Sequence, residues 1–142
     1  MKLNKIIQSL EEWAPSIYQE SYDNSGLIIG DINSDVNGCL ITLDCTEEVV
    51  DEAIKKNCNL IISHHPILFK SINKINFNNW ESRVIKKSIK NDINIYALHT
   101  NLDNVSNGVN KKICDILQMD NTEILRKKEN ISCRLDVYIP EK

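Results

Sequence analysis

Several kinds of signal are missing from this 142-residue sequence. No apolar run approaches the roughly 20 residues that are needed to cross a bilayer, and the first residues lack the apolar core of a signal peptide. Positive charge is not in excess, since the net charge is -3 and the signs are interspersed, which disfavours nucleic acid as a partner. No glycine-rich phosphate-binding loop is present. We therefore expect a cytoplasmic protein that binds neither nucleic acid nor a membrane.

The five cysteines form no Cys-x-x-Cys pair and are scattered along the chain. Most of them lie among apolar residues, which indicates small buried side chains in a reducing compartment rather than a disulfide framework. Cys45 remains a candidate for chemistry, because it comes just past the end of a predicted strand.

Short apolar runs that alternate with amphipathic segments predict a single α/β domain across residues 1–142. The runs typical of buried strands occupy 27–29, 39–43, 60–63 and 93–98. Helical periodicity marks 2–12, 47–56, 80–90 and 105–117, the last with Val109, Ile113, Cys114 and Leu117 on its buried side. We expect a mostly parallel sheet with flanking helices, and Thr46 as the N-cap of the helix at 47–56.

Residues 131–139 follow a different pattern, in which apolar and polar side chains alternate strictly. This period of two is typical of a strand with one face in water. We expect the segment at about 131–142 either to add a strand to a sheet edge or to open a region that this chain lacks.

Potential metal ligands follow the predicted strands at the point where each strand ends. They are Asp44, then His64 with His65, then His99 with Asp103, after the strands at 39–43, 60–63 and 93–98 respectively. Ligands bind outside the carboxyl ends of the strands in an open parallel sheet, so we expect these residues to meet at one rim. Imidazole and carboxylate together suit Zn, Fe, Mn, Co or Ni, and mixed sets are common in two-metal hydrolytic sites. The sequence therefore predicts a metal site at this rim.

Each of these residues also has a purely structural interpretation. A single histidine at a strand end is often a structural residue with satisfied hydrogen bonds. Asp103 is equally suited to be the N-cap of the following helix. Asp23 and Asn24 precede the first strand, and they are either turn residues that bond the local backbone or part of the rim of the site.

Four segments carry a resemblance to a known family. They are Tyr-Asp-Asn-Ser-Gly-Leu at 22–27, Leu-Asp at 43–44, Ile-Ile-Ser-His-His-Pro-Ile-Leu-Phe at 61–69, and Ala-Leu-His-Thr-Asn-Leu-Asp at 97–103 with Gly-Val-Asn at 108–110. In this order they closely resemble the Nif-three-like family (NGG-one-interacting factor three-like), whose members are often named GTP cyclohydrolase one type two homologues. The resemblance extends from Ile6 over nearly the whole chain.

The resemblance implies a dinuclear metal centre in an α/β fold and subunits that form a toroidal homohexamer. Transferred by position, the ligands of two divalent ions per subunit would be His64, His65, His99 and Asp103. Family members also use a His-x-x-x-Glu segment near the C-terminus, which this sequence lacks. We therefore expect this chain to be the N-terminal portion of a Nif-three-like protein, without the C-terminal half of the family fold.

The activity that the resemblance implies is metal-dependent hydrolysis, the opening of the nucleotide GTP. The catalytic base stays unassigned, with Asp44 and Asp23 as candidates at the rim. The first alternative is a non-catalytic module for metal binding, metal handling or assembly. The second is a hydrolase of the phosphoesterase type that acts on another substrate.

Overall fold

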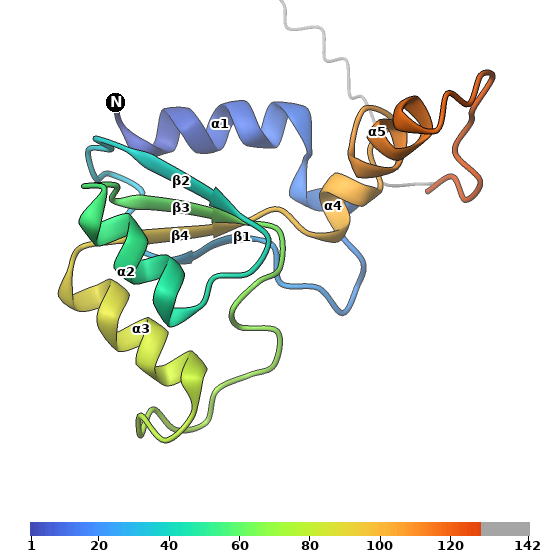
Figure 1. The fold of residues 1–142 in the computed structure, drawn as a ribbon. Coiled ribbons are helices and arrows are strands. Elements are labelled where there is room, and N and C mark those ends of the chain that lie inside the picture. Colours follow the sequence, from blue (N-terminus) through green and yellow to red (C-terminus); the bar gives the residue numbers. More distant parts are fainter. Residues whose placement is uncertain (129–142) are drawn as a thin grey trace, which may run out of the picture.

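Four short strands form one mixed sheet in the computed structural model, which describes residues 1–128 (Figure 1). In sheet order they are β1 (Gly26–Ile29), β4 (Asn94–Ala97), β3 (Leu60–Ser63) and β2 (Cys39–Thr42). β2, β3 and β4 are parallel, whereas β1 pairs with β4 in the antiparallel direction. The predicted α/β class and its flanking helices are confirmed, and β1 makes the sheet mixed.

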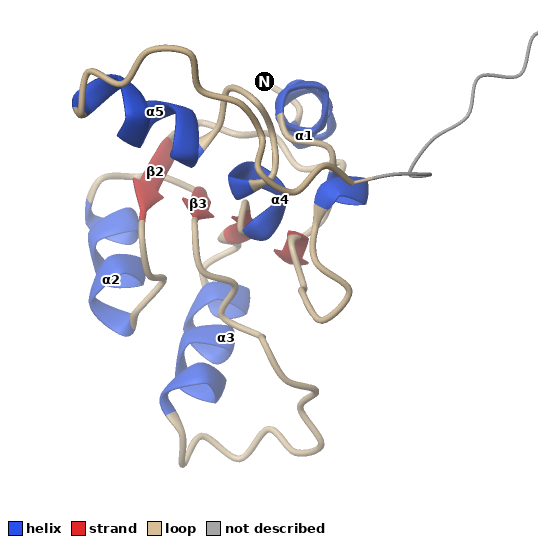
Figure 2. Ribbon diagram, turned by 90° about the vertical axis from the view of Figure 1, so that its right-hand side faces the viewer, coloured by secondary structure: helices blue, strands red, loops and turns tan. Residues whose placement is uncertain are grey.

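Helices cover both faces of this sheet (Figure 2). α2 (Glu47–Lys55) and α3 (Trp80–Lys90) lie together on one face, and α1 (Leu3–Trp13) lies on the other. A short 3₁₀ turn, η1 (Ser16–Tyr18), follows α1. The chain therefore forms three layers, with the sheet between the helices.

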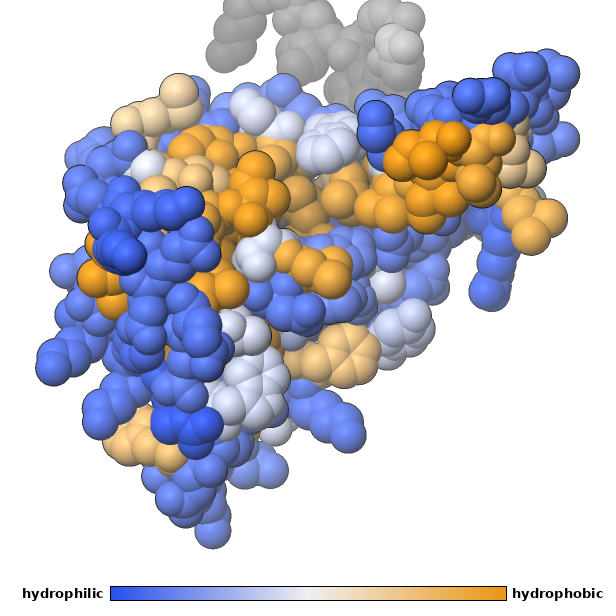
Figure 3. Space-filling view, in the orientation of Figure 1, coloured by the Kyte–Doolittle hydropathy of each residue, from blue (hydrophilic) through white to orange (hydrophobic). Residues whose placement is uncertain are grey.

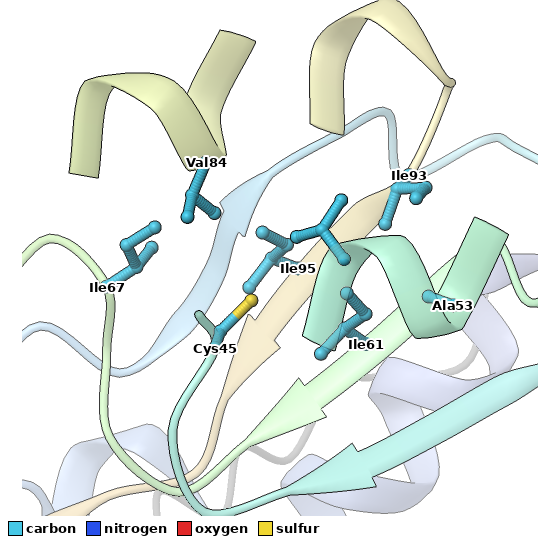
Figure 4. Packing of buried hydrophobic residues seen from close by; sticks show 8 residues of the cluster. Cys45, Ala53, Ile61, Ile67, Val84, Ile93 and Ile95 are labelled. Carbon is cyan, nitrogen blue, oxygen red and sulfur yellow. The ribbon is translucent and has the colours of Figure 1, made fainter. Parts of the chain in front are cut away.

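Alternate residues of the strands fill two separate cores. On the α2 and α3 side, Ile61 of β3 and Ile95 of β4 are fully buried against Val84 of α3 (Figure 4). On the α1 side, their neighbours Leu60 and Tyr96 are buried against Leu3. Successive side chains of a strand point to opposite faces, so strands buried on both faces are mainly apolar along their length. This is why the mainly apolar runs in the sequence predict β3 and β4 correctly, although β4 also contains the buried Asn94.

Side-chain caps and an ion pair hold α2 and α3 in place. Thr46 caps α2 as predicted, since its side chain accepts from the backbone N–H of Val49 at 3.4 Å. Asn79 caps α3 in the same way, through Ser82 at 3.1 Å. Arg83 of α3 also donates to Glu47 of α2 at 2.7 Å. These bonds keep the helices aligned with the parallel strands that they connect.

The predicted helix at 105–117 is wrong in its start and in its buried face. The structure has a single turn, α4 (Thr100–Asp103), and then α5 (Val109–Ile116), with Gly108 as the N-cap of α5. A Cβ at Gly108 would clash with the carbonyl oxygen of Leu102, so this tight junction between the two helices requires glycine.

No residue of α5 is buried, because α5 packs beside α4 and not on the sheet. Ile113, Ile116 and Leu117 lie at the surface, in an apolar area over α5 that Figure 3 shows in orange. The helical periodicity of this segment therefore reflects an apolar face that the described residues leave uncovered.

Two further predictions concern the C-terminal segment and the absence of membrane-spanning helices. The predicted strand at 131–139 lies outside the described residues. Within residues 1–128, none of the helices is both long and apolar enough to span a bilayer.

We predict that Ile61→Ala destabilises the fold by about 2–5 kcal/mol, because it removes a side chain that is 0% exposed and leaves a cavity between β3 and α2. Ile41 on the neighbouring strand is the matched control, since it is 79% exposed. Ile41→Ala should cost less than about 1 kcal/mol. Urea unfolding followed by circular dichroism measures both values, and equal losses would contradict the assignment of the core.

Candidate metal centre

The two adjacent histidines extend the parallel ladder beyond the end of β3. The backbone N–H of His64 donates to the carbonyl of Thr42 at 3.1 Å, and that of His65 donates to the carbonyl of Leu43 at 2.9 Å. Pro66 follows at once and ends the regular ladder. The backbone of both histidines is therefore held by β2, although neither residue belongs to a strand.

All three imidazole rings converge at this rim. The ring centroid of His64 lies 5.0 Å from that of His65 and 5.3 Å from that of His99. The centroids of His65 and His99 are 5.6 Å apart. One nitrogen of each ring lies within 4.8 Å of the corresponding nitrogens of the other two. The strand-end argument therefore places the three side chains correctly.

Asp23 lies beside this cluster because β1 runs antiparallel to β4. Gly26 at the start of β1 pairs with Ala97 at the end of β4, so the loop before β1 reaches the rim. There Asp23 Oδ1 lies 2.8 Å from Nδ1 of His99. The sequence leaves Asp23 between a turn and the rim, and the structure gives it both roles.

The carboxylate of Asp23 is fully enclosed and fully hydrogen bonded. Its side chain is 0% exposed. Oδ1 also accepts from the backbone N–H of Asn24 at 2.7 Å, and Oδ2 accepts from the backbone N–H of Thr100 at 3.0 Å and from the Thr100 hydroxyl. Burial alone would raise the pKa of Asp23, but the hydrogen bonds from Thr100, His99 and Asn24 outweigh it and lower this pKa below its ordinary value. Asp23 is therefore ionised, and its carboxylate only accepts hydrogen bonds.

Asp44 makes the corresponding contact with His65, but in solvent. Its Oδ1 lies 2.7 Å from Nδ1 of His65, and its side chain is 58% exposed. The two rim carboxylates thus each bind one histidine at the same ring nitrogen, one from inside the protein and one from the surface.

These contacts determine which nitrogen each ring presents to the cluster. An ionised carboxylate accepts hydrogen bonds only, so Nδ1 of His65 and of His99 carries the proton. Their Nε2 lone pairs are then free, as in metal-binding histidines whose other nitrogen donates to a carboxylate. The donor set fits a divalent transition metal such as zinc.

Asp103 lies outside this group in the described part of the chain, where the converging ligand atoms come from the three histidines. It ends α4, one helical turn after His99, and its backbone N–H donates to the carbonyl of His99 at 3.3 Å. Its role as a metal ligand stays a prediction. The alternative role as the N-cap of the next helix is wrong, because Gly108 occupies that position.

The two residues that follow His99, Thr100 and Asn101, have positioning roles that the sequence did not indicate. Thr100 donates to Asp23 twice, as described, and its Oγ1 also accepts from the backbone N–H of Glu20 at 2.9 Å. Asn101 is fully buried, accepts from the backbone N–H of His99 at 2.9 Å and donates to the carbonyl of Ala14 at 2.7 Å. A polar Thr-Asn pair directly after a histidine at a strand end was the available signal.

Aromatic side chains border the cluster on the His99 side. The ring of Phe69 lies 6.0 Å from that of His99 and 6.1 Å from that of Tyr22, edge to face in both pairs. Of the apolar residues at 67–69, Ile67 is buried, whereas Phe69 lies at the surface.

A cavity of about 860 Å³ is separate from the histidines. It lies between β1, the loop at 68–75 and α3, and none of the three histidines lines it. The histidine cluster is therefore not part of this cavity.

Cys45 is a core residue. Its side chain is 2% exposed and packs with Val50 and Ile61 under α2 (Figure 4). Burial raises the pKa of its thiol to about 12. The four cysteines in the described residues are free, but the expectation that most of them are buried is wrong, since Cys39 is exposed and Cys58 and Cys114 are only partly buried.

An α/β sheet that presents three imidazoles at the carboxyl ends of its parallel strands, two of them hydrogen bonded to carboxylates, defines a candidate metal-binding protein. The chain belongs to the Duf34/NIF3 (NGG1p interacting factor 3) family, whose model matches residues 1–140. This confirms the family that the motifs indicated.

Curated relatives of the chain include proteins named GTP cyclohydrolase 1 type 2 homolog. The one from Clostridium acetobutylicum is 45% identical over 127 residues, which are 89% of this chain and 47% of the relative. The one from Staphylococcus aureus strain MRSA252 is 40% identical over 141 residues, or 99% of this chain and 38% of the relative. The chain thus spans less than half of the length of these relatives.

Solved structures share the fold. A Bacillus cereus protein related to NIF3 superposes with a TM-score of 0.85 at 42% identity, over 90% of this chain and 36% of that protein. Reduced HcgD from Methanocaldococcus jannaschii superposes with a TM-score of 0.81 at 32% identity, over 89% of this chain and 50% of that protein.

We predict that Cys45 resists alkylation in the native protein at pH 8, since a thiol that is both enclosed and protonated is a poor nucleophile. Its labelling by iodoacetamide should be more than about a hundredfold slower than in urea. Peptide mass spectrometry measures this rate, and Cys39, which is exposed, serves as the internal control. Rapid native labelling of Cys45 would contradict its place in the core.

Proposed function

We propose that His64, His65 and His99 bind a divalent transition metal ion, and that this chain supplies the metal-binding rim of a metal-dependent hydrolase. The observation that carries the proposal is the convergence of three imidazoles within 4.8 Å, two of them oriented through Nδ1 by Asp44 and Asp23. Structural histidines do not require such convergence, whereas a metal site does.

A bound divalent ion would polarise a substrate oxygen and lower the pKa of a coordinated water. The protein's own part is to fix the ligands before the ion arrives. The ladder bonds hold the backbone of His64 and His65. Asp23 holds the ring of His99 through its Nδ1. This rigidity favours binding, because little conformational entropy is then lost.

The two rim carboxylates differ in what they offer a reaction. Asp23 already accepts four hydrogen bonds and has no free lone pair, so we assign it a positioning role. Asp44 is open to solvent and accepts from His65 through one oxygen. Of the two candidates, we therefore propose Asp44 as the base that takes a proton from the attacking water.

Two ions per subunit remain part of the proposal, with Asp103 as a further ligand. Three imidazoles and one carboxylate do not fill the coordination positions of two ions, so the others would be left to water, substrate or a neighbouring subunit. A homohexamer, as the family resemblance implies, and a cytoplasmic location, as expected from the sequence, belong to the same proposal.

The substrate class that we propose is a purine nucleotide such as GTP, opened by hydrolysis. The printed names of the relatives point to it, and the open rim leaves room for a ligand beside the histidines. A non-catalytic metal-handling module is the second candidate. It is favoured by the state of the two rim carboxylates, because Asp23 has no free lone pair and Asp44 is exposed to solvent.

We predict that the purified protein, without a histidine tag, contains close to stoichiometric zinc, iron, manganese, cobalt or nickel. His64→Ala should lose most of this metal and retain the fold, because its side chain lies at the rim and not in a core. His99→Ala should also lose most of the metal, but it should lower the stability as well, because it removes a hydrogen-bond partner of the buried Asp23. Elemental analysis with circular dichroism measures both quantities. Asp35→Ala is the control, since Asp35 is an exposed partner of Lys2.

Absence of metal in the wild-type protein after growth and dialysis with zinc would overturn the proposal. Turnover of GTP by the metal-loaded protein separates the two candidates. Turnover that His64→Ala abolishes supports the hydrolase. A metal-loaded protein that turns over neither GTP nor a phosphoester, but loses stability on chelation, supports the metal-handling module.

We predict that Asp44→Ala weakens zinc binding about tenfold and that Asp23→Asn weakens it by about 10–100-fold, because each change removes the carboxylate that orients a ligating ring. The larger effect at Asp23 follows from its enclosed position. Competition with a chromophoric chelator measures the affinities. Unchanged affinity in both variants would show that these carboxylates do not orient metal ligands.

A further inference from the structure

Two aromatic side chains stand exposed at the edge of the histidine cluster. Tyr22 is 64% exposed and Phe69 is 47% exposed. Their ring centroids lie 6.1 Å apart at an interplanar angle of 61°, and the Phe69 ring meets the His99 ring at 89°. The pair therefore continues from the imidazoles as one aromatic border, which we call the aromatic wall (Tyr22 and Phe69).

The aromatic wall is held in place by the two loops that carry it. Asn24, two residues after Tyr22, donates through Nδ2 to the carbonyl of Leu68 at 2.6 Å. Asp23, which lies between Tyr22 and Asn24, accepts hydrogen bonds from His99 and Thr100, so this loop is attached to the rim itself. The wall is thus fixed relative to the histidines before any ligand is present.

Phe69 is exposed, unlike the two apolar residues that precede it in the loop. The preceding apolar residue Ile67 is buried, and Leu68 is partly buried against the core. Only the third of these apolar residues turns outward, toward His99 and Tyr22. A large apolar side chain kept in water loses the free energy of burial, and ligand contact would recover it.

We propose that the aromatic wall binds the planar heterocyclic base of the ligand whose reacting part lies at the histidine cluster. This rests on the proposed function and assigns recognition of the base of that nucleotide to Tyr22 and Phe69. A base can lie against one ring of the wall and meet the other with its edge, since aromatic groups prefer offset and edge-to-face contacts. Such stacking is tolerant of the particular base, so the wall selects for a base and not for guanine.

The test compares guanosine 5′-monophosphate with ribose 5-phosphate, which lacks the base. Isothermal titration with the zinc-loaded protein and with the metal-free protein gives the ratio of the two affinities, the base selectivity. We expect a base selectivity of about tenfold or more. Tyr22→Ala and Phe69→Ala should each reduce it several-fold, and Tyr22→Phe should retain it because the ring remains.

Phe77→Ala is the matched control for these variants. Phe77 is a similarly exposed phenylalanine, 43%, but it lies under Lys86 at 4.3 Å, beside α3 and outside the cluster. Its removal should leave the base selectivity unchanged. Circular dichroism of each variant verifies that the fold is retained.

The outcomes separate the wall from the metal. Base selectivity that falls several-fold in both alanine variants and persists in Phe77→Ala supports the wall, even in a protein that holds no zinc. A base selectivity near one in the wild-type protein, or one that both alanine variants retain, overturns it, whatever the zinc content. Failure of the proposed function shows instead as missing metal or missing turnover with the base selectivity intact.

Discussion

The buried carboxylate of Asp23 connects two segments of the chain that are distant in sequence, the loop before β1 and the turn from β4 into α4. It binds its own loop through Asn24, the end of β4 through His99, and the start of α4 through Thr100. A buried carboxylate is stable only when its oxygens are fully hydrogen bonded, so these partners hold the anion as much as it holds them. The position of His99, the course of the loop at 22–25 and the direction of the chain after β4 all depend on this one group.

The layers and the two cores were predictable because each follows from a repeating pattern. Residues 60–63 and 93–98 are mainly apolar, as is typical of strands buried on both faces, and α1 shows its stripe of Leu3, Ile6, Ile7 and Leu10. The convergence of the histidines also followed, because the ends of neighbouring parallel strands meet. These predictions rest on geometry that every sheet shares.

Three other features could not be predicted from the sequence, each for a physical reason. The direction of β1 depends on its pairing with β4 through tertiary contacts, and only this direction brings Asp23 to the rim. The helix at 105–117 was mispredicted because its periodic face suggested burial, although no strand lies beneath it. Cys45 follows a strand, but its side chain turns under α2 into the core, and the spacing of residues does not record that turn.

The histidine cluster has a closed side and an open side. Asp23 is enclosed and its partner His99 is only 18% exposed, and the aromatic rings of Phe69 and Tyr22 border this side. His65 and Asp44 face solvent on the other side. For an ion held by all three rings, as we propose, water would reach the bond to His65 more readily than the bond to His99. Exchange of such an ion would then begin at the open side of the cluster.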